Sequence, residues 1–480
     1  MDLLPVELVR FVYQYCDPPT VRTLRLASAK FAEIGCDFLL PDHFTAVEWK
    51  DDIRRLHAIA RHERLCGRPR SLVFHLAKVH VGKARQATFL RQWLRDREGN
   101  DPIEDAWSSY HKLEERASLV APLYTRQPML EAAFKRLPNL ESVDISFTKN
   151  PYGLEFFNEI FQHHNCRKQD RPRVSKDLDA IVSALPHVRL QSLSIDQVPL
   201  ELFRQGETRQ HWFDCAPTFA NLSRLDLVLD VPPQMGPAAR SRAINGLGKV
   251  LQSASNLTHL RLAFHTYHAP AEKFELSFRA LFAGDFTYKK LTDLKLEGIS
   301  CSEQDLKAFL LRHSPTLERL RLGGRGLAKP CELSIGGIHL HNGRWRSLFA
   351  GLKENLVVLQ RFHLEGDIES GDAFTRTREV WDFLPMVSDD WSTIYQEDDF
   401  EGWYKKPGTS RCKENFDSIG LERFLISGGP WPMFIKYGNT SAYPSPYSSP
   451  SLSGSSSPID SPSPASSGTF STFGSPAPSV

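Results

Sequence analysis

The sequence predicts an α/β protein in which helix–turn–strand units stack beside one another and form a parallel sheet. The first observation is a phrase of the form Leu-x-x-Leu-x-Leu, which recurs from about residue 130 onward. The second is a helical stripe of apolar residues that precedes most copies of this phrase. Because one such unit cannot cover its own apolar face, the units must stack into a solenoid with a continuous core.

The repeated phrase ends in apolar residues that alternate with polar ones, as expected of a short strand with one buried face. Spacings between copies run from about 26 to about 60 residues, wider and less regular than a clean leucine-rich repeat. The clear copies are Leu140-Val143-Ile145, Leu190-Leu193-Ile195, Leu222-Leu225-Leu227, Leu257-Leu260-Leu262, Leu291-Leu294-Leu296 and Leu317-Leu320-Leu322. The looser copies are Leu359-Phe362-Leu364 and Leu421-Phe424-Ile426.

The apolar stripes before the phrases predict the helices of the units. They are Leu130-Phe134-Leu137, Leu178-Ile181-Val182-Leu185, Ile244-Leu247-Val250-Leu251, Leu306-Phe309-Leu310 and Trp345-Leu348-Phe349-Leu352-Leu356. Asn139, Asn221 and Asn256 stand just before the first leucine of their phrases. We expect each asparagine side chain to satisfy the backbone of a tight turn at that point.

Residues 3 to 39 carry a dense helical pattern. One stripe consists of Leu4, Leu8, Val12 and Tyr15, and a second consists of Val21, Leu24, Ala27 and Phe31. Between them, Asp17-Pro18-Pro19-Thr20 predicts the end of one helix and the capped start of the next. A helical unit of this size seldom stabilises itself alone, so it should pack on the rest of the chain, on a partner, or on both.

The pattern along the chain divides it into four segments. The expected boundaries are 1–41 for the N-terminal helical unit, 42–129 for a helical linker region, 130–437 for the repeat domain and 438–480 for a tail. The linker should be mostly helical and polar, with one strand near Leu72 and a solvated basic face between Arg54 and Arg70. An acidic and aromatic stretch at residues 385–418 predicts an insertion before a closing strand at 421–426.

The tail is rich in serine and proline, so we expect it to be disordered. Six of its serines precede a proline, namely Ser445, Ser449, Ser457, Ser461, Ser463 and Ser475. Phosphorylation by a proline-directed kinase would make the tail acidic. An inert tail is the alternative interpretation of the same composition.

Composition and charge exclude several classes of function. The chain has 480 residues and a formal net charge of +2, without the basic excess of a dedicated nucleic-acid binder. We see no secretory leader and no apolar run long enough for a membrane span, so we expect no membrane association. Its eight cysteines are scattered singly, which indicates reduced thiols in the cytoplasm or nucleus.

No motif in the sequence predicts catalysis. His163-His164-Asn165-Cys166 is the densest cluster of metal-ligand side chains, but adjacent histidines do not easily face one metal ion. Gly323-Gly324-Arg325-Gly326 lacks the spacing of a dinucleotide-binding loop, so we expect a turn there. We therefore expect no catalytic residues, no metal and no cofactor; an enzyme with an unrecognised site is the alternative.

The N-terminal stretch resembles an F-box. The family pattern opens with Leu-Pro and an acidic residue, which stand here as Leu4-Pro5-Val6-Glu7-Leu8. It continues with Asp17-Pro18 and with a Leu/Arg/Ser stretch that ends in an aromatic residue, here Val21 to Phe31. Ala27 stands where the family usually has valine, and Phe31 where tryptophan is common. The remaining chain is similar to the divergent leucine-rich-repeat F-box proteins of filamentous fungi.

The resemblance implies a three-helix F-box followed by an irregular leucine-rich-repeat solenoid. It also implies the function of a substrate-recognition subunit of a Skp–cullin–F-box ubiquitin ligase. Such a receptor is not an enzyme itself, because it only brings a target lysine near the ubiquitin-carrying enzyme. The implied partners are a Skp-type adaptor, a cullin bound through that adaptor, and an unknown protein target. A non-ligase interaction scaffold that retains an F-box is the alternative.

Two binding surfaces follow from the pattern and the resemblance. The expected adaptor-binding residues are Leu4, Pro5, Leu8, Val12, Val21, Leu24 and Phe31. The expected target-binding residues lie between the buried leucines of the strand phrases and point away from the core. They are Asp144, Ser194, Asp226, Arg261, Lys295 and Arg321. For any one of them, an ordinary solvated strand face is the alternative.

Overall fold

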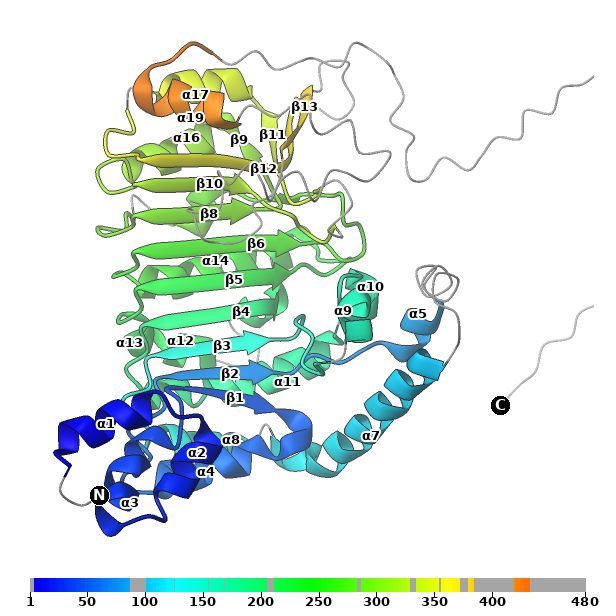
Figure 1. Ribbon diagram of the computed structural model, residues 1–480. Coiled ribbons are helices and arrows are strands. Elements are labelled where there is room, and N and C mark those ends of the chain that lie inside the picture. Colours follow the sequence, from blue (N-terminus) through cyan, green and yellow to red (C-terminus); the bar gives the residue numbers. More distant parts are fainter. Residues whose placement is uncertain are drawn as a thin grey trace, which may run out of the picture. The chain divides into compact units, whose positions relative to one another are not determined.

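The computed structural model in Figure 1 has one large compact unit, Met1–Phe434, and a second unit, Ile435–Val480. The structure describes residues 4–86, 101–124, 126–153, 155–167, 169–204, 211–282, 286–328, 334–353, 355–371, 379–383 and 418–431. The expected disordered tail with its Ser-Pro sites lies outside the described residues. Nearly all of the expected insertion at 385–418 lies outside them as well.

The N-terminal segment forms the helices α1 (Val6–Gln14), α2 (Pro18–Leu24) and α3 (Ala29–Gly35) and the 3-10 helix η1 (Cys36–Phe38). The Asp17 carboxylate caps α2 by accepting a hydrogen bond from the backbone N–H of Thr20, at 2.9 Å. The Ser28 hydroxyl caps α3 in the same way. These helices enclose a small core of their own, which consists of Val9, Tyr13, Val21, Phe31 and Ile34.

The main part of the fold is a 13-stranded sheet whose first nine strands run parallel in chain order. These strands are β1 (His43–Val47), β2 (Ser71–His75), β3 (Ser142–Ser146), β4 (Ser192–Pro199), β5 (Arg224–Asp230), β6 (His259–His265), β8 (Asp293–Glu297), β10 (Arg319–Gly323) and β12 (Arg361–Ser370). Neighbouring strands pair so that equivalent residues of successive units lie side by side, with one register shift between β4 and β5 after Ile195.

The sheet continues beyond β12 through a second set of short strands. This set is β11 (Ile338–Asn342), β9 (Ile299–Ser302) and β7 (Phe274–Glu275), all parallel, with β13 (Glu379–Phe383) antiparallel to β12. Gly298 separates β8 from β9 and has a φ of +70°, with its Cα packed against the backbone of Phe264. A side chain there would collide with that backbone, so the bend between the two sets of strands requires glycine.

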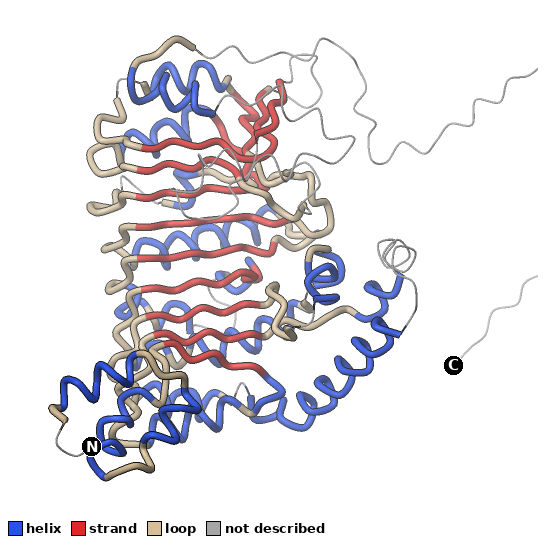
Figure 2. The backbone as a smooth tube through the Cα atoms, viewed as in Figure 1, coloured by secondary structure: helices blue, strands red, loops and turns tan. Residues whose placement is uncertain are grey.

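Helices cover one face of the sheet between successive strands (Figure 2). They are α4 (Asp52–Arg61), α8 (Gln127–Phe134), α11 (Arg171–Val182), α12 (His211–Asp214), α13 (Ala216–Phe219), α14 (Pro237–Ser253), α15 (Phe278–Leu281), α16 (Glu303–Arg312) and α17 (Trp345–Leu352). Their apolar stripes pack against the strand leucines in one continuous core. The expected helix–turn–strand unit and parallel sheet are therefore confirmed at this level.

A second, smaller core lies beside the first strands. It is formed by α5 (Val81–Gln86), α7 (Asp101–Tyr124), α9 (Glu155–Phe161) and α10 (His164–Arg167). Trp107 of α7 packs edge-on against Phe156 and Phe157 of α9. The 3-10 helix η2 (Glu48–Lys50) follows β1 and packs against α7, while η3 (Leu185–His187) and η4 (Leu200–Phe203) border β4.

Two expectations about the ends of the sheet are wrong. The sheet begins at β1, so residues 42–129 supply two of its strands as well as helices; only β2 was expected. The phrase at 421–426 is not a strand but part of α19 (Ser418–Ser427). Leu421 and Leu425 of α19 are buried against the last units, because a Leu-x-x-Phe-Leu spacing also suits one face of a helix.

Two of the three asparagines before the phrases, Asn139 and Asn256, join successive units instead of closing their own turns. The Asn139 side-chain amide donates to the carbonyl of Gly67 at 2.7 Å, and the Asn256 amide donates to Ala220 at 2.8 Å. Both acceptors belong to the turn of an earlier unit. The side chains therefore satisfy turn backbone, as expected, but in the neighbouring unit, because stacking brings the two turns together.

Candidate functional site

The N-terminal helical unit exposes a large apolar surface around α1. Seven of the eleven large apolar side chains exposed in the described part of the chain lie between residues 4 and 26. Leu8 is 51% exposed, Phe11 56% and Tyr15 78%. A cluster of exposed apolar side chains on one short segment indicates a contact site for another molecule, because water around it is unfavourable. We call it the α1 surface; it consists of Leu4, Val6, Leu8, Phe11, Val12 and Tyr15.

The opposite side of α1 holds the helix in place. Val9 and Tyr13 are fully buried, one helical turn apart, against α3. The Tyr13 hydroxyl donates a hydrogen bond to the carbonyl of Phe31 at 2.9 Å, and burial raises the pKa of this hydroxyl. Phe11 and Tyr15 contact each other edge to face at 5.1 Å on the exposed side. The buried face of α1 therefore holds the helix in place, and its other face is exposed to solvent.

Polar contacts fix this unit further. The Arg10 guanidinium pairs with the Asp37 carboxylate at 2.9 Å, which joins α1 to η1. The Lys30 ammonium donates to the carbonyl of Leu4, which holds the chain just before α1. The Arg64 guanidinium, from the turn after α4, donates to the carbonyl of Glu33 at 2.8 Å. These contacts connect the α1 surface to the first repeat unit.

The seven residues expected to bind an adaptor divide into two groups. Leu4, Pro5, Leu8 and Val12 are exposed on or beside the α1 surface. Val21 and Phe31 are buried and Leu24 is half-buried, so these three hold the helices together. Sequence reasoning did not select Val6, Phe11 and Leu26, although all three are exposed. The spacing of Phe11 from Leu8 and Tyr15 was the signal that could have found it.

The six residues expected to bind a target form one row across the sheet. The registers pair Asp144 with Ser194, Ser194 with Asp226, and Asp226 with Arg261. They continue from Arg261 to Lys295 and from Lys295 to Arg321. The row lies on the face opposite the helices, as the alternation of the strands requires. We call it the central row.

Exposure along the central row is uneven. Asp144, Ser194, Asp226 and Arg261 are half-buried and reach solvent. Lys295 and Arg321 are each only 6% exposed. The solvent exposure expected for these two residues is therefore wrong. For Lys295, Glu365 of β12 lies over its ammonium group and covers it.

Buried ion pairs connect the strands at this end. The Lys295 ammonium lies 3.2 Å from the Glu365 carboxylate, and the Arg261 guanidinium lies 3.3 Å from Glu297. Burial raises the pKa of Glu297, but a hydrogen bond from His265 and the charges of Arg261 and Lys295 outweigh it and hold this pKa well below its ordinary value. Sequence reasoning missed the glutamates because they follow the leucine phrase instead of lying within it.

A parallel row two residues earlier adds further charge. The Arg319 guanidinium lies 3.2 Å from the Asp293 carboxylate and 3.0 Å from the His259 ring. Burial lowers the pKa of His259, and the nearby charges of Arg224 and Arg319 lower it further. The ring is therefore neutral near pH 7 and accepts the hydrogen bond from Arg319. This arrangement supports polar binding but places no nucleophile beside a base.

Of the residues considered for chemistry, the glycine segment adjoins this surface, because the Gly326 N–H donates a hydrogen bond to the Glu297 carboxylate at 2.7 Å. The turn expected at Gly323 to Gly326 lies slightly later, because Gly323 ends β10 and the turn is at Gly326 and Leu327; Gly323 and Gly326 have φ values of +94° and +64°. Cys166 is buried in α10. Among the residues that the structure describes, no group of three acidic, histidine or cysteine side chains could hold a metal ion. Within the same residues, none of the helices combines the length and apolar character needed to cross a bilayer.

Comparisons with known proteins add no further constraint. None of the protein-family models matches the chain, and a search of curated proteins finds no similar sequence.

Proposed function

We propose that the chain is the substrate-recognition subunit of a Skp–cullin–F-box ubiquitin ligase. The observation that carries this proposal is the α1 surface: a well-capped helical unit whose first helix is apolar on both sides. Leu4, Val6 and Leu8 of this surface lie in the Leu-Pro segment that resembles the start of an F-box. In this proposal a Skp-type adaptor covers the α1 surface, and the adaptor connects the chain to a cullin.

The physical basis of the adaptor contact is apolar burial. Covering a side chain such as Leu8 or Phe11 contributes roughly 1.5 to 3 kcal/mol when it becomes fully buried. Several such side chains on one helix are enough to anchor a partner, since a few residues dominate most interfaces. The charged groups beside them, Arg10 and Asp37, already pair with each other and need no partner charge.

The target-binding surface in this proposal is the exposed half of the central row. Asp144, Ser194, Asp226 and Arg261 are half-buried, held by neighbouring strands, and present polar atoms on the face without helices. Lys295 and Arg321, which are buried, support that surface instead of contacting the target. The chain then acts without chemistry of its own, by holding a target near the ubiquitin-carrying enzyme.

The test is co-purification from the native cells, with the tagged full-length chain as bait. The proposal predicts that both a Skp-type adaptor and a cullin are recovered in comparable amounts. Recovery of the adaptor without a cullin would support the interaction scaffold instead. Absence of both would refute the assignment, whereas accumulation of one bound protein under proteasome inhibition would identify the target.

A further inference from the structure

The free edge of β1 is a second feature that the proposed function does not use. β1 is the first strand of the sheet, and among the strands that the structure describes it pairs with β2 alone. The backbone N–H groups of Arg70 and Ser71 both donate to the carbonyl of Asp42. In a parallel pair, every second residue of a strand directs both its N–H and its C=O toward the same neighbour. Because Asp42 bonds to β2, the backbone groups of Phe44 and Ala46 also bond to β2. The N–H and C=O groups of His43, Thr45 and Val47 therefore point to the open side.

The N–H group of Val47 already has a hydrogen-bond partner, so the open part of the edge ends before Val47. The Asp52 carboxylate, from the first turn of α4, accepts a hydrogen bond from the Val47 N–H at 3.0 Å. Its other oxygen lies 2.9 Å from the Arg55 guanidinium. His43 and Thr45 are exposed, and no hydrogen bond to their outward backbone groups is present among the described residues. Two residues of backbone are thus open for pairing.

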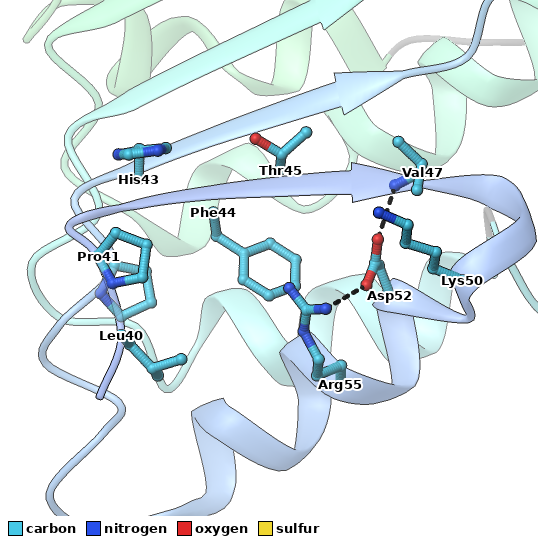
Figure 3. A pocket seen from close by; sticks show the side chains of 10 residues that line it. Leu40, Pro41, His43, Phe44, Thr45, Val47, Lys50, Asp52 and Arg55 are labelled. Atoms are coloured by element: carbon cyan, nitrogen blue, oxygen red, sulfur yellow. Dashed lines mark hydrogen bonds and ion pairs between the residues drawn. The ribbon is translucent and has the colours of Figure 1, made fainter. Parts of the chain in front are cut away.

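A pocket of about 240 Å³ lies along this edge (Figure 3). Its apolar lining consists of Leu40, Pro41, Phe44, Val47 and Pro69. The volume lies below the range of roughly 300 to 1,000 Å³ that is usual for small-molecule sites. It suits one or two side chains of a peptide better than a metabolite.

The charge of the pocket favours an acidic occupant. Lys50 and Arg55 line it with positive charge and Asp52 with negative charge, which leaves one net positive charge when His43 is neutral. Asp52 is buried and already paired with Arg55. Lys50 is exposed at the end of the strand and has no ion pair within the described residues. A carboxylate that pairs with Lys50 would not have to break an existing ion pair.

Edge strands of native proteins are usually protected by prolines, bulges or inward charges. β1 contains no proline and its register with β2 is regular over all five residues. The Arg55 guanidinium of α4 lies over the Phe44 ring, 4.7 Å from its centroid (Figure 3). β1 therefore lacks a proline and a bulge, two of the features that usually protect an edge strand.

We propose that the edge of β1 binds an extended acidic segment of a partner protein by strand addition. The partner backbone pairs with His43 and Thr45, an apolar side chain enters the pocket beside Phe44, and a carboxylate approaches Lys50. Backbone pairing gives affinity in such complexes, and the pocket and charge give specificity. The proposal is independent of the α1 surface and of the adaptor.

Thr45→Pro is the decisive variant. Proline removes the outward N–H and blocks the approach of another strand, but it leaves the β1–β2 hydrogen bonds intact, since Thr45 does not donate to β2. Thr45→Val is the matched control, because it keeps the N–H and changes only the side chain. Lys50→Glu tests the charge. Thermal unfolding of each variant shows whether the fold is preserved.

The probe is a random peptide library displayed on phage and selected on the purified full-length chain. We expect enriched peptides with alternating apolar residues and at least one acidic residue. Binding of a labelled enriched peptide should weaken by about tenfold or more in Thr45→Pro, weaken in Lys50→Glu and stay unchanged in Thr45→Val. Bound peptide should also slow amide exchange at His43 and Thr45 more than at Phe44.

Three results would overturn the proposal. The selection could yield no specific peptide, or its peptides could bind Thr45→Pro as tightly as the unaltered chain. The chain could also form a dimer that Thr45→Pro dissociates, which would show that two copies pair through this edge. Loss of adaptor binding in α1 variants would not affect any of these outcomes, so failure here and failure of the ligase role are distinguishable.

Discussion

The sequence pattern predicts that Lys295 is exposed, which would make its replacement by methionine nearly neutral. Because Lys295 is buried in the structure, we expect this replacement to destabilise the fold strongly. The Lys295 ammonium lies 3.2 Å from the Glu365 carboxylate, and Glu365 is only 1% exposed. Methionine keeps most of the side-chain volume but leaves this carboxylate buried without its cation. Removing one partner of a buried pair costs about 3 to 5 kcal/mol. Glu297, whose pKa Lys295 also lowers, adds to the loss.

The assay is urea-induced unfolding followed by circular dichroism, with two companion variants. Lys149→Met breaks the ion pair with Asp144, which is 3.5 Å long but largely exposed on the lysine side, and should cost less than about 1 kcal/mol. The double variant of Lys295→Met with Glu365→Gln should recover most of the stability, since no buried charge is then unpaired. If the free energy of unfolding of Lys295→Met were within about 1 kcal/mol of that of the unaltered chain, the division of the central row into an exposed half and a buried half would be refuted.

Two further predictions concern packing and pH. Gly246→Ala in α14 should lower stability by about 2 kcal/mol or more in thermal unfolding, because the added carbon would lie 1.8 Å from the carbonyl oxygen of Phe203. Burial raises the pKa of Asp367 to about 6, although Lys273 opposes this shift. The unfolded carboxyl loses its proton first, so stability should fall as pH rises from about 4 to about 6 and then level off. Asp367→Asn should remove this slope, and an unchanged slope would contradict the assignment.

The strand phrases predicted most of the sheet because their buried leucines occupy equivalent positions in neighbouring strands and so determine the register. Leu193, Leu225 and Leu260 lie side by side as equivalent positions. The first strand was not predicted, since His43 to Val47 carries no leucine phrase and its neighbours read as helical. The phrase ending at Ile426 was misread because a spacing of three residues fits both a strand phrase and a helix.

The candidate site was predicted in part, for a similar reason. The alternation of each strand placed Asp144 and Lys295 on the same face correctly. Their different burial could not be predicted, because it depends on Glu365, which is far away in the sequence and reaches Lys295 only after the strands stack. In the N-terminal helices, the sequence could not separate the exposed Leu8 of α1 from the buried Val21 of α2, since both belong to apolar stripes.

Adaptor binding by the α1 surface is the central claim, and isothermal titration of a purified Skp-type adaptor into the full-length chain tests it most directly. The double variant Leu8→Ala with Phe11→Ala removes two exposed side chains and should weaken binding by at least about tenfold, with little change in unfolding temperature. Leu119→Ala removes an even more exposed apolar side chain from α7 and should leave binding unchanged. Equal affinity of the double variant and the unaltered chain, or no binding by the unaltered chain, would contradict the account.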